Sequence, residues 1–196
     1  MGGVGEALPF GGEGIVCLEH RNYTNRFPYN PFFTSMVNIA YLLLGTNLGN
    51  RSLNLSQATA MIAQTIGLVT AASGIYETEP WGVTGQPNYR NQVLATETAL
   101  EPMAMLAQIH EIEKSLGRER RIRWEARLID VDILYYNDWV VNQETLVVPH
   151  ARLAERRFVL APLVEIAPDF VHPVLKKTNR DLLEECPDLL AVSKVD

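Results

Sequence analysis

The fold can be predicted outward from NIAYLLLGTNLGNRSLNLSQATAMIAQTIG, residues 38–67. The first eight of these residues form an apolar run ended by a glycine, which is typical of a buried strand. The following residues favour a helix closed by Gly67, because glycine readily adopts the conformation that ends helices. The apolar residues at roughly helical spacing are Leu53, Ala60, Ile62 and Ile66. The stretch therefore predicts a strand followed by a helix.

The segments that follow continue the alternation of strand and helix patterns. We expect strands at 68–78 and 89–100, a helix at 101–117, a strand at 128–136, a hairpin at 137–150, a short strand or helix around 157–168, and an amphipathic helix near 178–190. The order β-α-β-β-α-β predicts an α+β, ferredoxin-like fold, with a mainly antiparallel sheet, helices on one face and C-terminal additions. This architecture hosts many functions, so the chemistry must come from particular side chains.

Residues 1–37 differ from the rest of the chain. They are glycine-rich at first, then polar and aromatic, and they show neither strand nor helix periodicity. We expect a disordered leader, which is either an upstream extension or the result of a mis-assigned start, since Met36 directly precedes the patterned region. Residues 38–196 are expected to form a single domain around one core.

Composition excludes several classes of protein. The formal net charge of -6 argues against a general binder of nucleic acid or anionic membranes. Cys17 and Cys186 lie far apart without metal-ligand spacing, so neither a zinc site nor a disulfide framework is expected. The apolar runs are much shorter than the roughly 20 residues that cross a bilayer. These features predict a cytoplasmic protein without nucleic-acid or membrane partners.

Two aspartates stand inside the mostly apolar stretch RLIDVDILYY, residues 127–136. Side chains alternate along a strand, so Asp130 and Asp132 share one face while Val131 and Ile133 point to the other. Neighbouring carboxylates repel and resist burial, which favours a bound cation; oxygen ligands without nearby His or Cys favour Mg²⁺. The alternative is that the aspartates cap an edge or pair with nearby arginines.

The stretch GRERRIRWEAR, residues 117–127, directly precedes this strand and holds five arginines against two glutamates. Guanidinium groups bind phosphate oxygens bidentately and stay charged near neutral pH. A carboxylate pair beside an arginine-rich loop suits phosphoryl transfer, in which a metal and arginines offset developing charge. The alternative is a solvated basic turn.

From about residue 38 onward the chain resembles the 6-hydroxymethyl-7,8-dihydropterin pyrophosphokinase family of folate biosynthesis. The resemblance rests on LLLGTNLGNR, YETEPWG, QPNYRNQV, IEKSLGRER, RWEARLIDVDIL and VPHARLAERRFVLAPLVEIAPDFVHP, which occur in the family's order. It implies a transferase that moves pyrophosphate from ATP to the hydroxymethyl group of 6-hydroxymethyl-7,8-dihydropterin and releases AMP, using two Mg²⁺ ions. Protein partners are not implied.

The resemblance also implies roles for individual residues. The catalytic group would be Arg118, Arg127, Asp130 and Asp132, with both metal ions held by the two aspartates. The ATP-binding group would be Glu113, Arg120, Trp124, His150 and Arg156, with Arg120 and Trp124 on a mobile loop that closes over the site. The pterin-binding group would be Thr78, Trp81, Tyr89, Asn91 and Phe158, in which Asn91 contacts the polar ring edge and Tyr89 and Phe158 flank the ring. A polar-edged aromatic ligand needs such stacking faces and an amide that both donates and accepts.

Several features of the sequence allow two interpretations. GTNLGNR, residues 45–51, is either a phosphate cradle or a strand-to-helix turn, since it matches neither common nucleotide-binding fingerprint. Glu125 and Ala126 replace a rigid Gly-Pro pair common in the family, so we expect the arginine-rich loop to close differently from that of many relatives. Ala151 also departs from the family pattern. The general base is either Asp132 or a metal-bound water. The competing function is a nucleic-acid-binding module, which would need a broader basic face.

Overall fold

The first strand and helix form as the opening stretch predicts. Strand β1 (Asn38–Thr46) is followed by helix α1 (Arg51–Thr65), whose first turn is capped by the side chain of Asn50. The computed structural model describes residues 37–80, 85–117 and 128–195, all within the unit Ser35–Asp196. The remaining elements are β2 (Leu68–Ala72), β3 (Tyr76–Thr78), β4 (Tyr89–Thr98), α2 (Pro102–Ser115), β5 (Asp130–Tyr136), β6 (Val141–Asn142), β7 (Val147–Val148), a 3-10 turn (Leu153–Glu155), α3 (Arg157–Ile166), α4 (Asn179–Glu184) and β8 (Val192–Lys194).

The main sheet of the described residues has the order β5-β1-β4-β3-β8, and β2 pairs with β4 beside β3. All of these pairings are antiparallel. Counting β2 and β3 as one interrupted strand gives the β-α-β-β-α-β order with the first strand at the centre, which confirms the predicted α+β, ferredoxin-like fold. The predicted hairpin is also present, as the pair β6 and β7.

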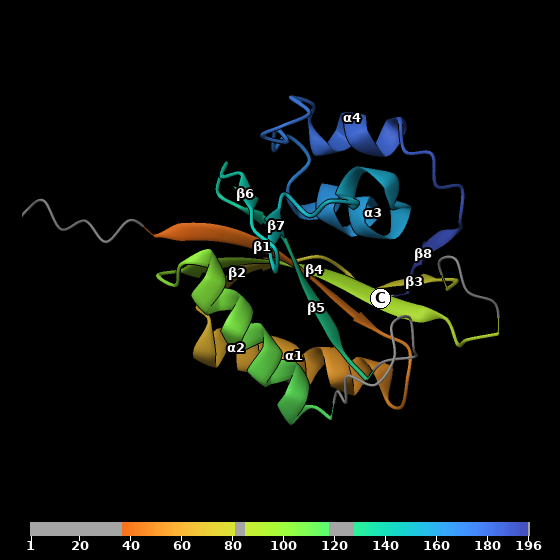
Figure 1. Cartoon of the computed structure of the whole chain (residues 1–196). Helices are drawn as coiled ribbons and strands as arrows, with labels where there is room; N and C mark the ends of the chain where they lie inside the picture. Colours follow the sequence, from red (N-terminus) through yellow and green to blue (C-terminus); the bar gives the residue numbers. More distant parts are fainter. Residues whose placement is uncertain (1–36, 81–84, 118–127, 196) are drawn as a thin grey trace, which may run out of the picture. The chain divides into compact units, whose positions relative to one another are not determined.

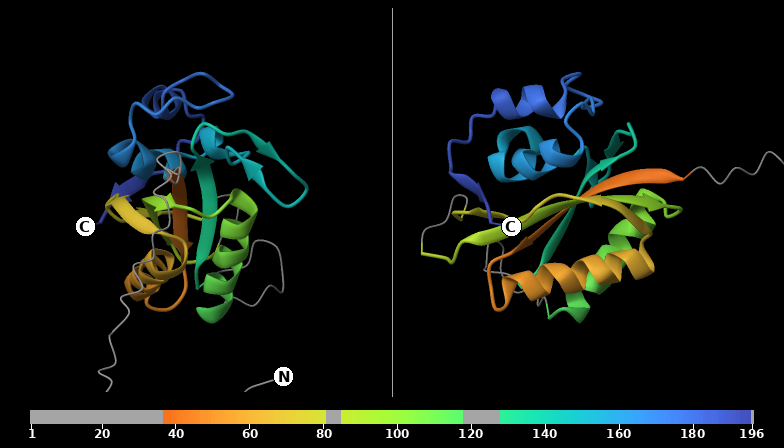
Figure 2. Two further views of the ribbon diagram at one scale, coloured as in Figure 1. Left: turned by 90° about the vertical axis from the view of Figure 1, so that its left-hand side faces the viewer. Right: turned by 180° about the vertical axis from the view of Figure 1, so that it is seen from behind.

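Helices cover both faces of this sheet (Figure 1). Helices α1 and α2 pack on one face, where Leu55, Ile62, Met105 and Ile109 meet alternate residues of the strands. On the opposite face the C-terminal helix α3 lies against the sheet and α4 packs on α3, and together they form a second core around Val159, Leu160, Leu163 and Leu182 (Figure 2). A sheet buried on both faces explains why β1 is a continuous apolar run.

The predicted strand 68–78 is interrupted in the structure. Ser73 is bonded twice to Val93 of β4: its N–H donates to the Val93 oxygen at 2.9 Å, and its Oγ accepts from the Val93 N–H at 3.0 Å. Ala72 pairs with Leu94 but Tyr76 pairs with Asn91, so the stretch from Ala72 to Tyr76 holds one residue more than the matching part of β4. Such an extra residue is a β-bulge, and it separates the two strands.

Two further predictions were wrong in detail. Leu53 and Ala60 lie on the exposed side of α1, whereas Leu55 and Ala58 join Ile62 in the core. The helix expected near 178–190 ends at Glu184, and the residues after it include the short strand β8, which pairs with β3.

Within the described ranges, no helix is both long and apolar enough to cross a membrane. The leader expected at residues 1–37 lies outside the described residues, apart from Val37, and stays a prediction.

Candidate active site

The two aspartates of β5 lie on the face of the sheet that α3 covers. Val131 and Ile133 are buried in the core beneath α1 and α2, so the alternation of the strand directs Asp130 and Asp132 to the opposite face. Both aspartates are partly exposed, unlike the apolar residues between and after them. A rigid strand thus presents two carboxylates to a partly open surface.

Glu113 of α2 supports this strand from the edge of the sheet. Its side chain is buried, and Oε1 accepts a 2.9 Å hydrogen bond from the N–H of Val131, the residue between the two aspartates. Because β5 is the end strand of the described sheet, the carboxylate takes the place that a neighbouring strand would have. Glu113 therefore contacts the backbone of β5 from α2, on the side of the sheet opposite to the two aspartate side chains. The adenine-side role expected for it stays a prediction.

His150 and Arg156 lie within electrostatic range of the same carboxylates. The N–H of His150 donates to the Leu134 oxygen of β5 at 3.0 Å, which fixes the segment beside the strand. Burial lowers the pKa of His150 to about 4; the positive charge of Arg156 acts in the same direction, and Asp130 opposes it. His150 is therefore a neutral imidazole near pH 7.

Burial also lowers the pKa of Arg156, and the charges of Asp132 and Asp130 oppose that shift. A guanidinium keeps its proton near neutral pH, so Arg156 places a positive charge beside the carboxylate pair. Its central carbon lies 5.6 Å from the ring centroid of Phe158, within the range of a cation-π contact. Arg156 thus connects the residues expected to bind ATP with one expected to flank the pterin.

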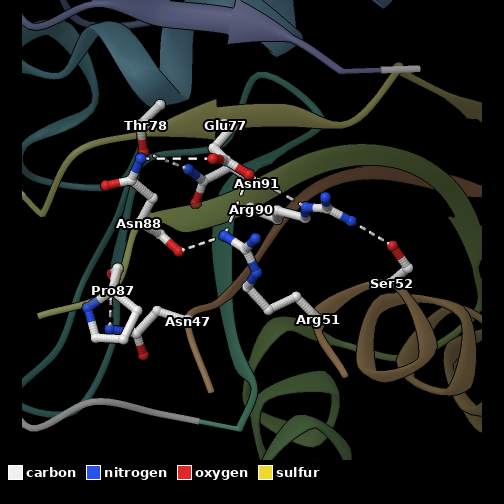
Figure 3. Close-up of polar contacts among 9 residues, drawn as sticks. All are labelled: Asn47, Arg51, Ser52, Glu77, Thr78, Pro87, Asn88, Arg90 and Asn91. Atoms are coloured by element: carbon white, nitrogen blue, oxygen red, sulfur yellow. Dashed lines mark hydrogen bonds and ion pairs between the residues drawn. The ribbon is translucent and has the colours of Figure 1, made fainter. Parts of the chain in front are cut away.

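The polar residues expected at the pterin ring lie on β3 and β4. Asn91 and Thr78 are 2% and 3% exposed, and Asn91 Nδ2 donates to Thr78 Oγ1 at 3.0 Å (Figure 3). Tyr89 pairs with Thr78 across the strands and is partly exposed, and its hydroxyl lies 3.4 Å from Gln86 Oε1. The three residues therefore form one polar and aromatic corner of the sheet.

Gly45 of β1 lies between the carboxylates and this corner. It pairs with Asp130 on one side and with Asn91 on the other, so the three residues form a row across three neighbouring strands. The strand spacing puts the backbones of Asp130 and Asn91 ~10 Å apart. A Cβ at Gly45 would lie 3.2 Å from Asn91 Oδ1, so the glycine leaves room for the amide. The sequence marks Gly45 as the end of a strand and the start of GTNLGNR, but its register with Asp130 carries no local signal.

The structure brings together Asp130, Asp132, His150 and Arg156 at one end of this face, and Thr78, Tyr89 and Asn91 across the row through Gly45. The expected site residues Trp81, Arg118, Arg120, Trp124 and Arg127 lie outside the described residues, as do Glu125 and Ala126. The arginine-rich loop therefore stays a prediction.

Comparison with known proteins identifies the family of this chain. Residues 41–168 match the family model described as 7,8-dihydro-6-hydroxymethylpterin-pyrophosphokinase (HPPK). A 2-amino-4-hydroxy-6-hydroxymethyldihydropteridine pyrophosphokinase of Bacillus subtilis is 46% identical over 132 residues, which cover 67% of this chain and 79% of that one. The protein of the same name from Aquifex aeolicus is 37% identical over 145 residues, covering 74% and 90% of the two chains.

Among solved structures, the wild-type HPPK-DHPS of Plasmodium falciparum with SDX-DHP is similar with a TM-score of 0.63. The two proteins are 20% identical, so this similarity supports the fold alone. The match covers 76% of this chain and 43% of the longer Plasmodium protein. The family match and the bacterial relatives carry the assignment. The chain therefore belongs to the 7,8-dihydro-6-hydroxymethylpterin-pyrophosphokinase family.

Proposed function

We propose that this protein transfers pyrophosphate from ATP to the hydroxymethyl group of 6-hydroxymethyl-7,8-dihydropterin, giving AMP and the pterin diphosphate. The observation that carries the proposal is the row Asp130, Gly45 and Asn91 on one sheet face. It places a carboxylate pair suited to metal and phosphate beside an amide suited to a polar heterocycle, in a chain of this family. The two substrates would meet over Gly45.

At the phosphate end, Asp130 and Asp132 would hold Mg²⁺, two ions in all. The donor set fits: the carboxylates are partly exposed, and oxygen is the ligand type that Mg²⁺ prefers. In the part of the chain that the structure describes, no group of three or more His, Cys, Asp or Glu could hold a metal. The aspartates would therefore share the ions with water and phosphate oxygens, as is usual for Mg²⁺. When bound, the metal neutralises charge on the phosphate oxygens.

The neighbouring cations and imidazole complete the nucleotide end. Arg156 offers a planar guanidinium for bidentate contact with phosphate. His150 is neutral, so it can accept or donate a hydrogen bond to the nucleotide without adding charge. Glu113 keeps β5 in place and thereby the spacing of the two carboxylates.

At the pterin end, the amide of Asn91 would contact the ring edge. An amide both donates and accepts, as the mixed N–H and C=O edge of a pterin requires. The bond from Asn91 to Thr78 fixes the orientation of that amide before the ligand arrives. Tyr89 and Phe158 would supply the aromatic faces that stack on the ring.

The reaction follows from this placement. The hydroxymethyl oxygen forms a bond to the β-phosphorus of ATP, and the bond from that phosphorus to the bridging oxygen of AMP breaks. The hydroxyl proton leaves to Asp132 or to water. The residues bind, orient and balance charge rather than react covalently, which is the usual division of work in phosphoryl transfer.

The test is release of AMP from ATP and Mg²⁺, measured with and without the hydroxymethyl dihydropterin. We expect AMP only when the pterin is present, together with an equal amount of pterin diphosphate. Asp138→Asn is a matched control for changes at Asp130 and Asp132, because Asp138 is exposed in the turn after the same strand. A folded protein that forms no AMP with both substrates present would refute the proposal.

A further inference from the structure

The turn between β1 and α1, residues 47–50, contacts the segment that leads into the proposed pterin site. Asn47 is buried, with 2% of its surface exposed. Its Nδ2 donates to Gln86 Oε1 at 3.2 Å and to the Pro87 oxygen at 3.4 Å. Figure 3 shows Asn47 directly beside Pro87. One amide group therefore bonds to two of the residues just before β4.

Arg51, the first residue of α1, holds the next residue of the same segment. Its guanidinium donates to the Asn88 oxygen at 2.8 Å and pairs with Glu77 of β3 at 3.2 Å (Figure 3). Asn88 Nδ2 in turn lies 3.4 Å from Glu77 Oε1. Residues 86 and 87 are thus bonded to the turn through Asn47, and residue 88 to the first residue of α1, directly and through Glu77.

A second pair of contacts ties the same helix start to β4. Arg90 pairs with Glu77 at 3.4 Å and also donates to the hydroxyl of Ser52 in α1. Arg90 stands between Tyr89 and Asn91, and its side chain lies on the opposite face of the strand from theirs. The contacts therefore hold β4 from behind the proposed pterin site.

These contacts extend to a residue of that site. Gln86 Oε1, which accepts from Asn47, also accepts from the hydroxyl of Tyr89 at 3.4 Å. The chain Asn47, Gln86, Tyr89 joins the β1–α1 turn to a ring that would stack on the pterin. A displacement of the turn would thus move the stacking ring.

Two other asparagines, at the turn and in the first turns of α1, bond to the protein itself. Asn50 accepts from the Leu53 N–H at 3.1 Å and caps α1. Asn54 donates to Thr46 Oγ1 and to the Leu48 and Leu128 oxygens. Side chains committed to internal bonds favour the structural alternative for GTNLGNR over the phosphate cradle.

We propose that Asn47 and Arg51 act as a clamp that positions residues 86–88 and, through them, Tyr89 and Asn91 for the pterin. The clamp rests on the proposed function. Both are positioning residues, since neither would touch a substrate. The clamp sets affinity for the pterin and leaves affinity for the nucleotide unchanged.

The test compares Asn47→Ala and Arg51→Met with the control Asn50→Ala, which changes the same turn without a bond to residues 86–88. Each full-length protein is titrated calorimetrically with the hydroxymethyl dihydropterin in the presence of Mg²⁺ and α,β-methylene ATP. In this analogue carbon replaces the oxygen of the bond that would break, so no transfer occurs. A parallel titration measures the Kd of the analogue alone.

We expect each clamp variant to raise the pterin Kd about tenfold, as for two lost hydrogen bonds of ordinary strength, with the nucleotide Kd within about twofold of the parent. In turnover, the KM for the pterin should rise while the KM for ATP stays constant. Asn50→Ala should lower the unfolding temperature but leave both Kd values at the parent's. Arg51 is partly exposed, so Arg51→Met tests the clamp even if Asn47→Ala does not fold.

The outcomes are distinct. Parent-like pterin affinity in the folded variants would overturn the clamp alone, because the parent still binds and converts the pterin. A loss of nucleotide affinity with pterin affinity intact would also overturn it and favour the phosphate cradle. A parent protein that neither binds nor converts the pterin would refute the proposed function, and the clamp with it.

Discussion

Replacing Gly45 with alanine is expected to weaken pterin binding far more than nucleotide binding. The new Cβ would lie 3.2 Å from Asn91 Oδ1, the one heavy atom within 4 Å of it among the described residues outside its chain neighbours. This distance is shorter than an ordinary van der Waals contact, so Asn91 must move by a few tenths of an ångström. Asp130, although paired with Gly45 in register, is not in contact with the added methyl group.

Asn91 has little room for this movement. It is 2% exposed, and its amide donates to Thr78 at 3.0 Å, so a shift lengthens that bond or turns the amide away from the pterin edge. A buried polar group that loses its partner costs about 1–3 kcal/mol. At about 1.4 kcal/mol for each tenfold change, the pterin Kd should rise roughly 5- to 140-fold.

The assay is calorimetric titration of the pterin with Mg²⁺ and α,β-methylene ATP present, followed by titration of the analogue alone. Gly49→Ala is the matched control: it strains the backbone at a φ of 62°, but among the described residues its Cβ meets only Leu128, at an ordinary 3.5 Å, and it contacts neither Asn47 nor residues 86–88. It should lower stability and leave the pterin Kd unchanged. The reasoning is refuted if Gly45→Ala binds the pterin as the parent does, or if it loses both ligands equally.

Other changes test the remaining parts of the structure. Asp130→Asn and Asp132→Asn should each lower kcat for AMP release at least about a hundredfold, the scale of one electrostatic stabiliser; activity within a few fold of the parent would remove the metal role. Gly67→Ala would place a Cβ 2.0 Å from a backbone oxygen of β4, so it should destabilise the protein by about 3 kcal/mol or more in denaturant unfolding. An unchanged midpoint would contradict that contact. Tyr135→Phe removes the hydroxyl that donates to Oδ1 of buried Asn179 at 2.8 Å, so it should lower the free energy of unfolding by about 1–3 kcal/mol. The KM values should stay unchanged, and denaturant unfolding together with steady-state kinetics would check both results.

Local patterns were sufficient for the order of the elements and for the face of the two aspartates. Strand and helix periods are properties of neighbouring residues, so the alternation in β5 placed Asp130 and Asp132 together without knowledge of their surroundings. The side of α1 that faces the sheet was not predicted correctly, since Leu53 and Ala60 are exposed and Leu55 and Ala58 are buried. Several apolar stripes were available on that helix, and packing against the sheet selected one of them.

Features that depend on distant residues could not be predicted in the same way. The interruption between β2 and β3 depends on the two bonds between Ser73 and Val93, which is 20 residues away. Strand β8 has only three residues and pairs with β3 across more than a hundred positions of the chain, so its own sequence carries little signal. A strand this short forms because the edge of an existing sheet, here β3, offers it hydrogen-bond partners.

The sequence by itself determined the α+β order, the carboxylate pair and, through its motifs, the family. Only the tertiary structure decided that Gly45 lies between Asp130 and Asn91, and that Asn47 contacts Gln86, 39 residues further along the chain. Motif residues follow from local chemistry, whereas strand register and turn contacts follow from the packing of the whole sheet. For this reason the stretch GTNLGNR, residues 45–51, which alone could have been a phosphate cradle, acquires its proposed role as a clamp only in the folded protein.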